Sequence, residues 1–112
     1  MTDRPIDKQI LARLFGDDDE TQSAILLEYS LSLSAYLLEF EQALAIKSAA
    51  GVQAVTHKMK SSSRTVGAAL LACECEALEL AGKCGDWAEI EVRAKGFVAA
   101  IKSVQACIAD DL

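Results

Sequence analysis

The sequence predicts an all-α protein: an antiparallel up-down four-helix bundle preceded by a short extra N-terminal helix. Alternating strand patterns are almost absent. Apolar residues recur at three- and four-residue spacing, and residues that favour the start or end of a helix separate the segments. The connections at about 48–50, 65–67 and 82–86 are short, so consecutive helices are expected to be antiparallel neighbours. With no linker and no internal repeat, residues 1–112 are expected to form a single domain.

A short helix is expected at about 7–15 and a long one at about 18–47. The short helix has an apolar face and stops at Gly16; the face comprises Ile10, Leu11, Leu14 and Phe15. The long helix begins in the acidic cluster 17–20, whose charges favour a helix N-terminus. Its apolar stripe follows three-to-four spacing. The stripe comprises Ile25 or Leu26, Tyr29, Leu33, Tyr36, Leu37, Phe40 and Leu44.

Three further helices are expected at about 49–64, 67–82 and 86–109. The expected inward residues of the first are Val52, Val55, Met59 and Ser62. Those of the second are Leu70, Leu71, Cys73, Ala77, Leu78 and Leu80. The last helix opens with Asp86 and Glu89 in an acidic version of the capping box. Its apolar stripe comprises Ile90, Ala94, Phe97, Val98, Ile101, Val104 and Ile108.

Composition narrows the classes of function. The formal net charge is −6, and an acidic surface does not attract nucleic acid or an anionic membrane. No apolar run reaches the roughly 18 residues of a membrane span. The first five residues lack the apolar core of a signal peptide. We therefore expect a cytoplasmic protein that binds neither nucleic acid nor a membrane.

The four cysteines lack the spacing of a metal site. Cys73 and Cys75 are two residues apart, which on a helix places them about 200° apart. Cys84 and Cys107 add no second ligand pair with zinc-like spacing. Reduced thiols that serve as small packing residues are the favoured interpretation, and no metal site is expected.

The single histidine, His57, has the most informative surroundings. No Asp or Glu occurs from Gln42 to Cys73, although the chain has 17 acidic residues. On a helical wheel His57 lies about 200° from both Val55 and Met59, on the side opposite the apolar stripe. The residues expected to share its face are Gln53, Ala54, Lys60, Ser61 and Arg64, with Lys58 at the flank.

This arrangement suits a phosphoryl group. Near neutral pH most imidazole is unprotonated and nucleophilic. Lysine and arginine can attract phosphoryl oxygens, and the small residues at 61–63 leave space for a bulky partner. The alternative is an exposed histidine on a solvated basic face. Composition and spacing alone leave both interpretations open.

The run from His57 to Ala68, His-Lys-Met-Lys-Ser-Ser-Ser-Arg-Thr-Val-Gly-Ala, resembles the signature of histidine phosphotransfer (HPt) domains of bacterial phosphorelays. The resemblance implies that His57 is the phosphorylated histidine and that Lys60 is the lysine three residues on. Ser61 stands where the family often has glycine, and Gly67 falls in the turn into the next helix. Both are expected to keep the site open. Lys60 is expected to offset phosphoryl charge, together with Lys58 and Arg64.

The resemblance also implies what the protein lacks and what it binds. Family members have no ATP site and no catalysis of their own, so the chain is not expected to be an enzyme. The expected partners are receiver domains of a hybrid sensor kinase or a response regulator. Mg²⁺ belongs to the receiver, so no cofactor is expected here. A chain that closes its bundle alone is expected to be a monomer.

Glu79 is a further candidate for the site, identified by counting residues from the histidine of the motif. In some relatives a glutamine on the following helix bonds the non-reacting ring nitrogen, and Glu79 occupies the corresponding position. A carboxylate there would fix the tautomer and leave Nε2 as the nucleophile, but it would also favour the imidazolium. The alternative is an ordinary glutamate facing solvent.

Two other functions fit the same sequence. A non-phosphorylated helical adaptor would bind receiver-like partners without using His57. A phosphotransfer fragment of a histidine kinase would be a helical hairpin that completes its bundle by dimerising, whereas this chain has enough amphipathic helices to close one alone.

Overall fold

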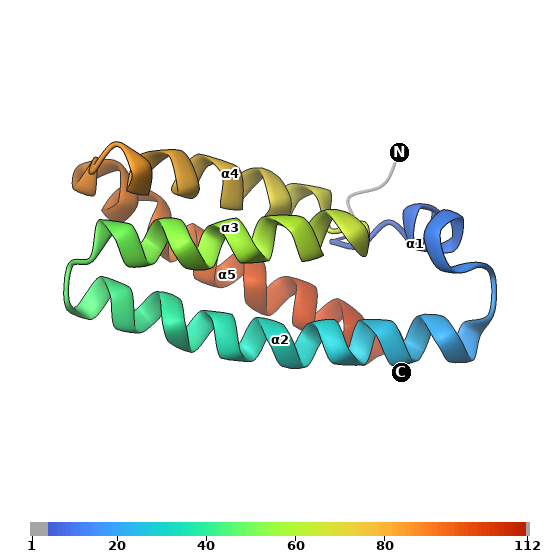
Figure 1. The fold of residues 1–112 in the computed structure, drawn as a ribbon. Coiled ribbons are helices and arrows are strands. Elements are labelled where there is room, and N and C mark those ends of the chain that lie inside the picture. Colours follow the sequence, from blue (N-terminus) through green and yellow to red (C-terminus); the bar gives the residue numbers. More distant parts are fainter. Residues whose placement is uncertain (1–4, 112) are drawn as a thin grey trace.

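Five helices make up the computed structural model, which describes residues 5–111 (Figure 1). They are α1 (Lys8–Phe15), α2 (Asp19–Ala45), α3 (Ala49–Thr65), α4 (Ala69–Lys83) and α5 (Trp87–Asp111). No strand occurs in this part of the chain, so the prediction of an all-α fold is confirmed. The helix bounds lie within about two residues of those expected, which is the usual uncertainty of helix ends.

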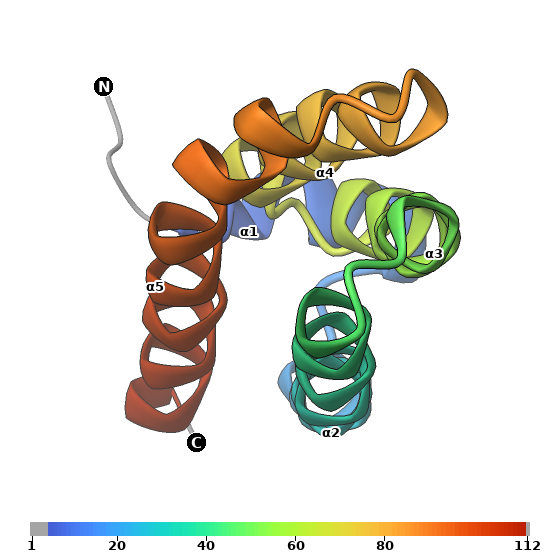
Figure 2. The same ribbon diagram turned by 90° about the vertical axis from the view of Figure 1, so that its left-hand side faces the viewer.

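The four long helices form a closed ring of contacts. Each packs against two others, in the order α2, α3, α4, α5 and back to α2. The colours of Figure 1 show that successive long helices reverse direction, and Figure 2 shows α3 and α4 side by side above α2 and α5. The short helix α1 packs against α2 and α3. None of the described helices is long and apolar enough to cross a membrane.

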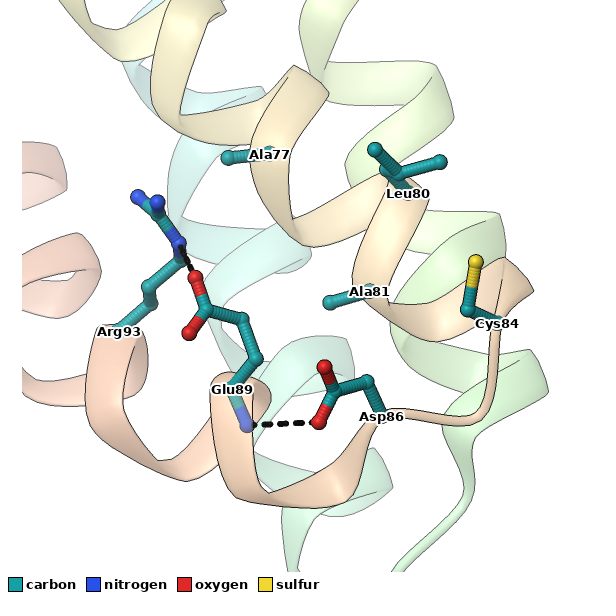
Figure 3. A pocket seen from close by; sticks show the side chains of 7 residues that line it. All are labelled: Ala77, Leu80, Ala81, Cys84, Asp86, Glu89 and Arg93. Carbon is teal, nitrogen blue, oxygen red and sulfur yellow. Dashed lines mark hydrogen bonds and ion pairs between the residues drawn. The ribbon is translucent and has the colours of Figure 1, made fainter.

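Local chemistry explains where the helices begin and end. Asp7 and Ser48 cap α1 and α3 by accepting backbone N–H bonds from Gln9 and Gly51. The predicted capping acid of α5 does the same: Asp86 Oδ1 accepts from the Glu89 amide at 3.2 Å (Figure 3). Capping and turn residues thus set helix bounds close to those that the sequence predicts.

The core is apolar and contributed by all five helices. Phe40 of α2 and Phe97 of α5 are fully buried and meet edge to face, with ring centroids 4.8 Å apart. The predicted stripes of α2 and α5 are confirmed. Their buried members are Leu26, Tyr29, Leu33, Phe40, Ile90, Phe97, Ile101, Val104 and Ile108.

The inward faces predicted for α1 and α4 are partly wrong. In α1 only Leu11 is buried, and Leu14 is 58% exposed. In α4 Leu70 and Leu80 are 68% and 62% exposed. The buried face of α4 is rotated away from them because its small residues allow close approach to α3. This face comprises Leu71, Ala72, Cys75, Leu78, Ala81 and Gly82.

A polar pair joins α2 to α3 inside the core. Ser63, not the predicted Ser62, is the buried serine of α3, and its Oγ lies 2.7 Å from the hydroxyl oxygen of Tyr29. Burial raises the pKa of Tyr29, so the phenol stays protonated. The pair gives both hydroxyls a partner where water is excluded.

Removing the partner of that phenol is expected to destabilise the fold. Ser63→Ala leaves the buried Tyr29 hydroxyl without a hydrogen bond, which costs about 1–2 kcal/mol of unfolding free energy. Tyr29→Phe made in the Ser63→Ala background is expected to cost less than the same change in the wild type. Urea unfolding of the two single variants and the double variant measures this coupling, and strictly additive losses would contradict it.

Candidate functional site

His57 lies near the middle of α3 and points out of the core. Its side chain is 68% exposed, while Val55 and Met59 are fully buried on the opposite side of the helix. The helical periodicity predicts this orientation. The ring is therefore accessible to another protein, and its environment is set by side chains at the surface.

Glu79 of α4 contacts the imidazole directly. Its Oε2 lies 2.8 Å from Nδ1 of His57, and its Oε1 lies 2.6 Å from Nζ of Lys60. Lys60 and Glu79 are each 19% exposed, so the carboxylate lies in a shielded position between the two α3 side chains. The three residues form a bridge across the α3–α4 seam, which we call the His57–Glu79–Lys60 network.

An ionised Glu79 favours one tautomer of the imidazole. Lys60 is the largest cause that lowers the pKa of Glu79, and the hydrogen bond with His57 lowers it further against a partial desolvation. An ionised carboxylate can only accept a hydrogen bond. In neutral His57 this contact therefore favours the tautomer in which Nδ1 carries the proton and donates to Glu79. This leaves the lone pair on Nε2, the nitrogen that does not contact Glu79.

The other two predicted cations are paired with acids of neighbouring helices. Lys58 Nζ lies 2.9 and 3.0 Å from the two carboxylate oxygens of Glu39 on α2, and 5.6 Å from the centroid of the Tyr36 ring. Arg64 Nη2 lies 3.4 Å from Glu76 Oε1 on α4. Although the sequence around His57 contains no Asp or Glu, the fold brings glutamates of α2 and α4 next to its cations.

Ser61 and Gly67 occupy different kinds of position. Ser61 is exposed one turn beyond His57 on the same face, where a larger side chain would stand beside the ring. Gly67 is buried at the α3–α4 turn with φ +82°, ten residues from His57. A Cβ there would collide with the backbone carbonyl of Asp7, whose amide donates to the Gly67 carbonyl at 2.9 Å. Gly67 thus allows the N-terminal segment to pack closely on this turn, and its expected part in keeping the site open stays a prediction.

Sequence reasoning missed Gly82, which lies where α4 approaches the backbone of α3 closely. It is a buried helical residue of α4, and a Cβ there would lie 2.8 Å from the Ala49 carbonyl oxygen and 2.9 Å from the Gln53 nitrogen. Gly82 lies one turn from Glu79 on α4, and Gln53 lies one turn from His57 on α3. The signal available in the sequence was a glycine inside an otherwise regular helical pattern.

Two shallow grooves lie along the outer side of α4. One includes Lys60 and Glu79 of the network together with Cys73, Leu80 and Lys83. Figure 3 shows the other, between α4 and α5, where Arg93 and Glu89 form an ion pair beside Ala77 and Leu80. His57 lines neither of these two grooves.

The described residues contain no group of three or more His, Cys, Asp or Glu side chains that could hold a metal ion. The cysteines are free thiols, and only Cys75 is buried, with a pKa raised to about 12 chiefly by burial. The packing role predicted for cysteines holds for Cys75. Cys73 and Cys84 are exposed, so packing does not account for them.

An all-helical protein with an outward-facing imidazole, held at one nitrogen and open at the other, has the features of a histidine phosphotransfer protein. The chain belongs to the Hpt domain family, whose model matches residues 24–107. This membership supports a phosphotransfer carrier in phosphorelays, a family whose members interact with receiver domains.

The fold agrees with this assignment. The structure is similar to that of histidine-containing phosphotransfer protein B (HptB) from Pseudomonas aeruginosa PAO1, with a TM-score of 0.88 and 21% sequence identity. The match covers 97% of this chain and 95% of that one. No curated protein matches the sequence at a significant level.

Proposed function

We propose that the protein carries a phosphoryl group on Nε2 of His57 between two receiver domains. The observation that carries the proposal is the contact of Glu79 with Nδ1, which leaves the exposed Nε2 with its lone pair. The donor is the aspartyl phosphate of one receiver, and the acceptor is the aspartate of another. The chain acts as an intermediate and not as an enzyme with its own ATP site.

In the proposed transfer every bond that forms is matched by one that breaks, and this chain needs no cofactor of its own. The Nε2 lone pair attacks phosphorus, the acyl O–P bond breaks, and the donor aspartate leaves as a carboxylate. In the second transfer an acceptor carboxylate oxygen attacks phosphorus and the N–P bond breaks. Mg²⁺, where needed, is proposed to be held by the receiver.

The cations have separate roles in this proposal. Lys60 keeps Glu79 ionised through their 2.6 Å contact. Lys58 and Arg64 are 48% and 58% exposed, and ion pairs this exposed contribute little stability. Both can therefore exchange their glutamate partners for phosphoryl oxygens when a loaded receiver binds.

The proposal includes the state of the carrier. We propose an antiparallel up-down four-helix bundle with a short leading helix, which acts as a monomer in the cytoplasm. Its partners are the receivers of a hybrid sensor kinase or of a response regulator. The ring of helix contacts among α2–α5 supports a bundle closed within one chain.

The test is to identify the labelled atom. After incubation with a phosphorylated receiver, the protein should carry label that is lost in acid and kept in base, on the peptide that contains His57. Nitrogen-15 NMR of the loaded ring should place phosphorus on Nε2. Acid-stable label, or label on another residue, would overturn the proposal.

The space beside His57 gives a second prediction. Ser61→Tyr places a large side chain one turn from the ring, so transfer from a receiver should slow by about tenfold or more, equivalent to about 1.4 kcal/mol. Loading by phosphoramidate, a small donor that needs no docking surface, should change little. Rates with both donors are measured by label uptake.

The control is Ser103→Tyr, the same change at an exposed position of α5. It should leave both rates unchanged. Equal slowing by the two variants, or equal slowing with both donors in Ser61→Tyr, would show that Ser61 does not provide access for the receiver.

A further inference from the structure

Glu79 holds the ring nitrogen that does not react, at 2.8 Å. When Nε2 uses its lone pair to attack phosphorus, the N–P bond forms while Nδ1 still carries its hydrogen. The ring then has substituents on both nitrogens and is a cation. It can keep the Nδ1 proton or release it to solvent.

That proton decides how readily the phosphoryl group leaves. With Nδ1 protonated, cleavage of the N–P bond returns the electron pair to Nε2 and releases neutral imidazole. With Nδ1 bare, the same cleavage would release an imidazolate anion, a much poorer leaving group, so transfer would wait for a proton. A carrier that keeps the proton completes its cycle without any proton transfer.

We propose that Glu79 retains the Nδ1 proton on phosphorylated His57 and so keeps the ring in its transfer-competent form. This inference rests on the proposed function and extends it from the free protein to the loaded one. An ionised carboxylate can only accept a hydrogen bond, so it favours a protonated Nδ1. A glutamine amide can turn its NH₂ toward a bare nitrogen and would therefore tolerate either state.

The charged side chains around the His57 ring favour a proton on Nδ1. Lys60 binds Oε1 and leaves Oε2 for the ring. Since Lys60 also lowers the pKa of Glu79, the shared proton belongs to Nδ1 and not to the carboxylate. Three other cationic side chains lie near this face. Lys58 pairs with Glu39 of α2 and Arg64 with Glu76 of α4, and Lys83 of α4 lines the same groove as Lys60 and Glu79.

The test compares wild type with Glu79→Gln after loading both with phosphoramidate. In nitrogen-15 NMR the wild-type phosphohistidine should keep its Nδ1–H from about pH 6 to about pH 9, and its hydrolysis rate should stay nearly constant. In Glu79→Gln the Nδ1–H should titrate within this range. Its hydrolysis should then slow about tenfold per pH unit above the titration midpoint.

Glutamine matches glutamate in size and can still accept from Nδ1–H in the unloaded protein, so the variant separates proton retention from choice of tautomer. Glu91→Gln, which alters an exposed glutamate of α5, should behave like the wild type. A bare Nδ1 in the wild type at about pH 7, or identical pH profiles for wild type and Glu79→Gln, would overturn this inference. Absence of any label on His57 would instead overturn the proposed function.

Discussion

His57→Gln is expected to abolish acid-labile labelling by a phosphorylated receiver, with uptake reduced at least about a hundredfold. Glutamine has no ring nitrogen with a free lone pair, so it cannot form the N–P bond. The side chain is 68% exposed and outside the core, so the substitution should change unfolding free energy by less than about 0.5 kcal/mol. Label uptake and urea unfolding measure the two quantities separately.

The same variant distinguishes the carrier from the alternative adaptor. A carrier requires label on the wild type and its loss in His57→Gln, with receiver binding retained in both. An adaptor would bind equally well in both forms and carry no label in either. Persistent label in His57→Gln would show that another residue accepts the phosphoryl group.

The kinase-fragment alternative depends on oligomeric state. A fragment of that kind completes its bundle with a second copy, whereas here each of the four long helices already has two neighbours within one chain. Light scattering of the purified protein should therefore give a mass near 12.0 kDa. A dimer formed by exchange of α3 would favour the kinase interpretation.

The sequence predicted the all-α class and the helix bounds because local chemistry sets both. Gly16 ends α1, Asp86 caps α5, and three-to-four periodicity runs through α2 and α5. It also predicted that His57 faces outward, since a helix with one strong apolar stripe leaves little choice of orientation. These features depend on residues near one another in the chain.

Features that depend on how helices rotate against one another were harder to predict. In α4 two stripes have helical spacing, and the prediction favoured the larger leucines, including Leu70 and Leu80. The structure buries Cys75 and Gly82 because α3 and α4 pack closely. Hydrophobicity undervalues such small residues, although they allow a short distance between helices.

The glutamates around His57 were also hard to predict, because their positions depend on how the helices pack against one another. Nothing in the sequence near His57 indicates Glu39 or Glu76, which are 18 and 19 residues away. Glu79 was located by counting along a related motif, and its contact with Nδ1 follows from the register of α4 against α3. Its role in transfer stays a prediction that Glu79→Gln tests.

Gly82→Val is expected to lower the unfolding free energy by about 3 kcal/mol, toward the upper end for overpacking. A Cβ at this position would already lie within 3 Å of two backbone atoms of α3, and backbone cannot move aside as a flexible side chain can. The helices must therefore separate at Gln53, one turn from His57. We expect the Glu79–His57 hydrogen bond to lengthen, which the Nδ1–H signal in NMR would report together with urea unfolding.

Gly96→Val is the matched control, because a Cβ at Gly96 of α5 meets nothing within 4 Å. Its unfolding free energy should change by less than about 0.5 kcal/mol, since valine is a slightly better helix former than glycine. Similar losses in the two variants would show that valine in a helix, and not the close approach of α4 to α3, is responsible. Loss of stability in Gly82→Val with an unchanged Nδ1–H signal would separate packing at Gly82 from the geometry of the His57–Glu79–Lys60 network.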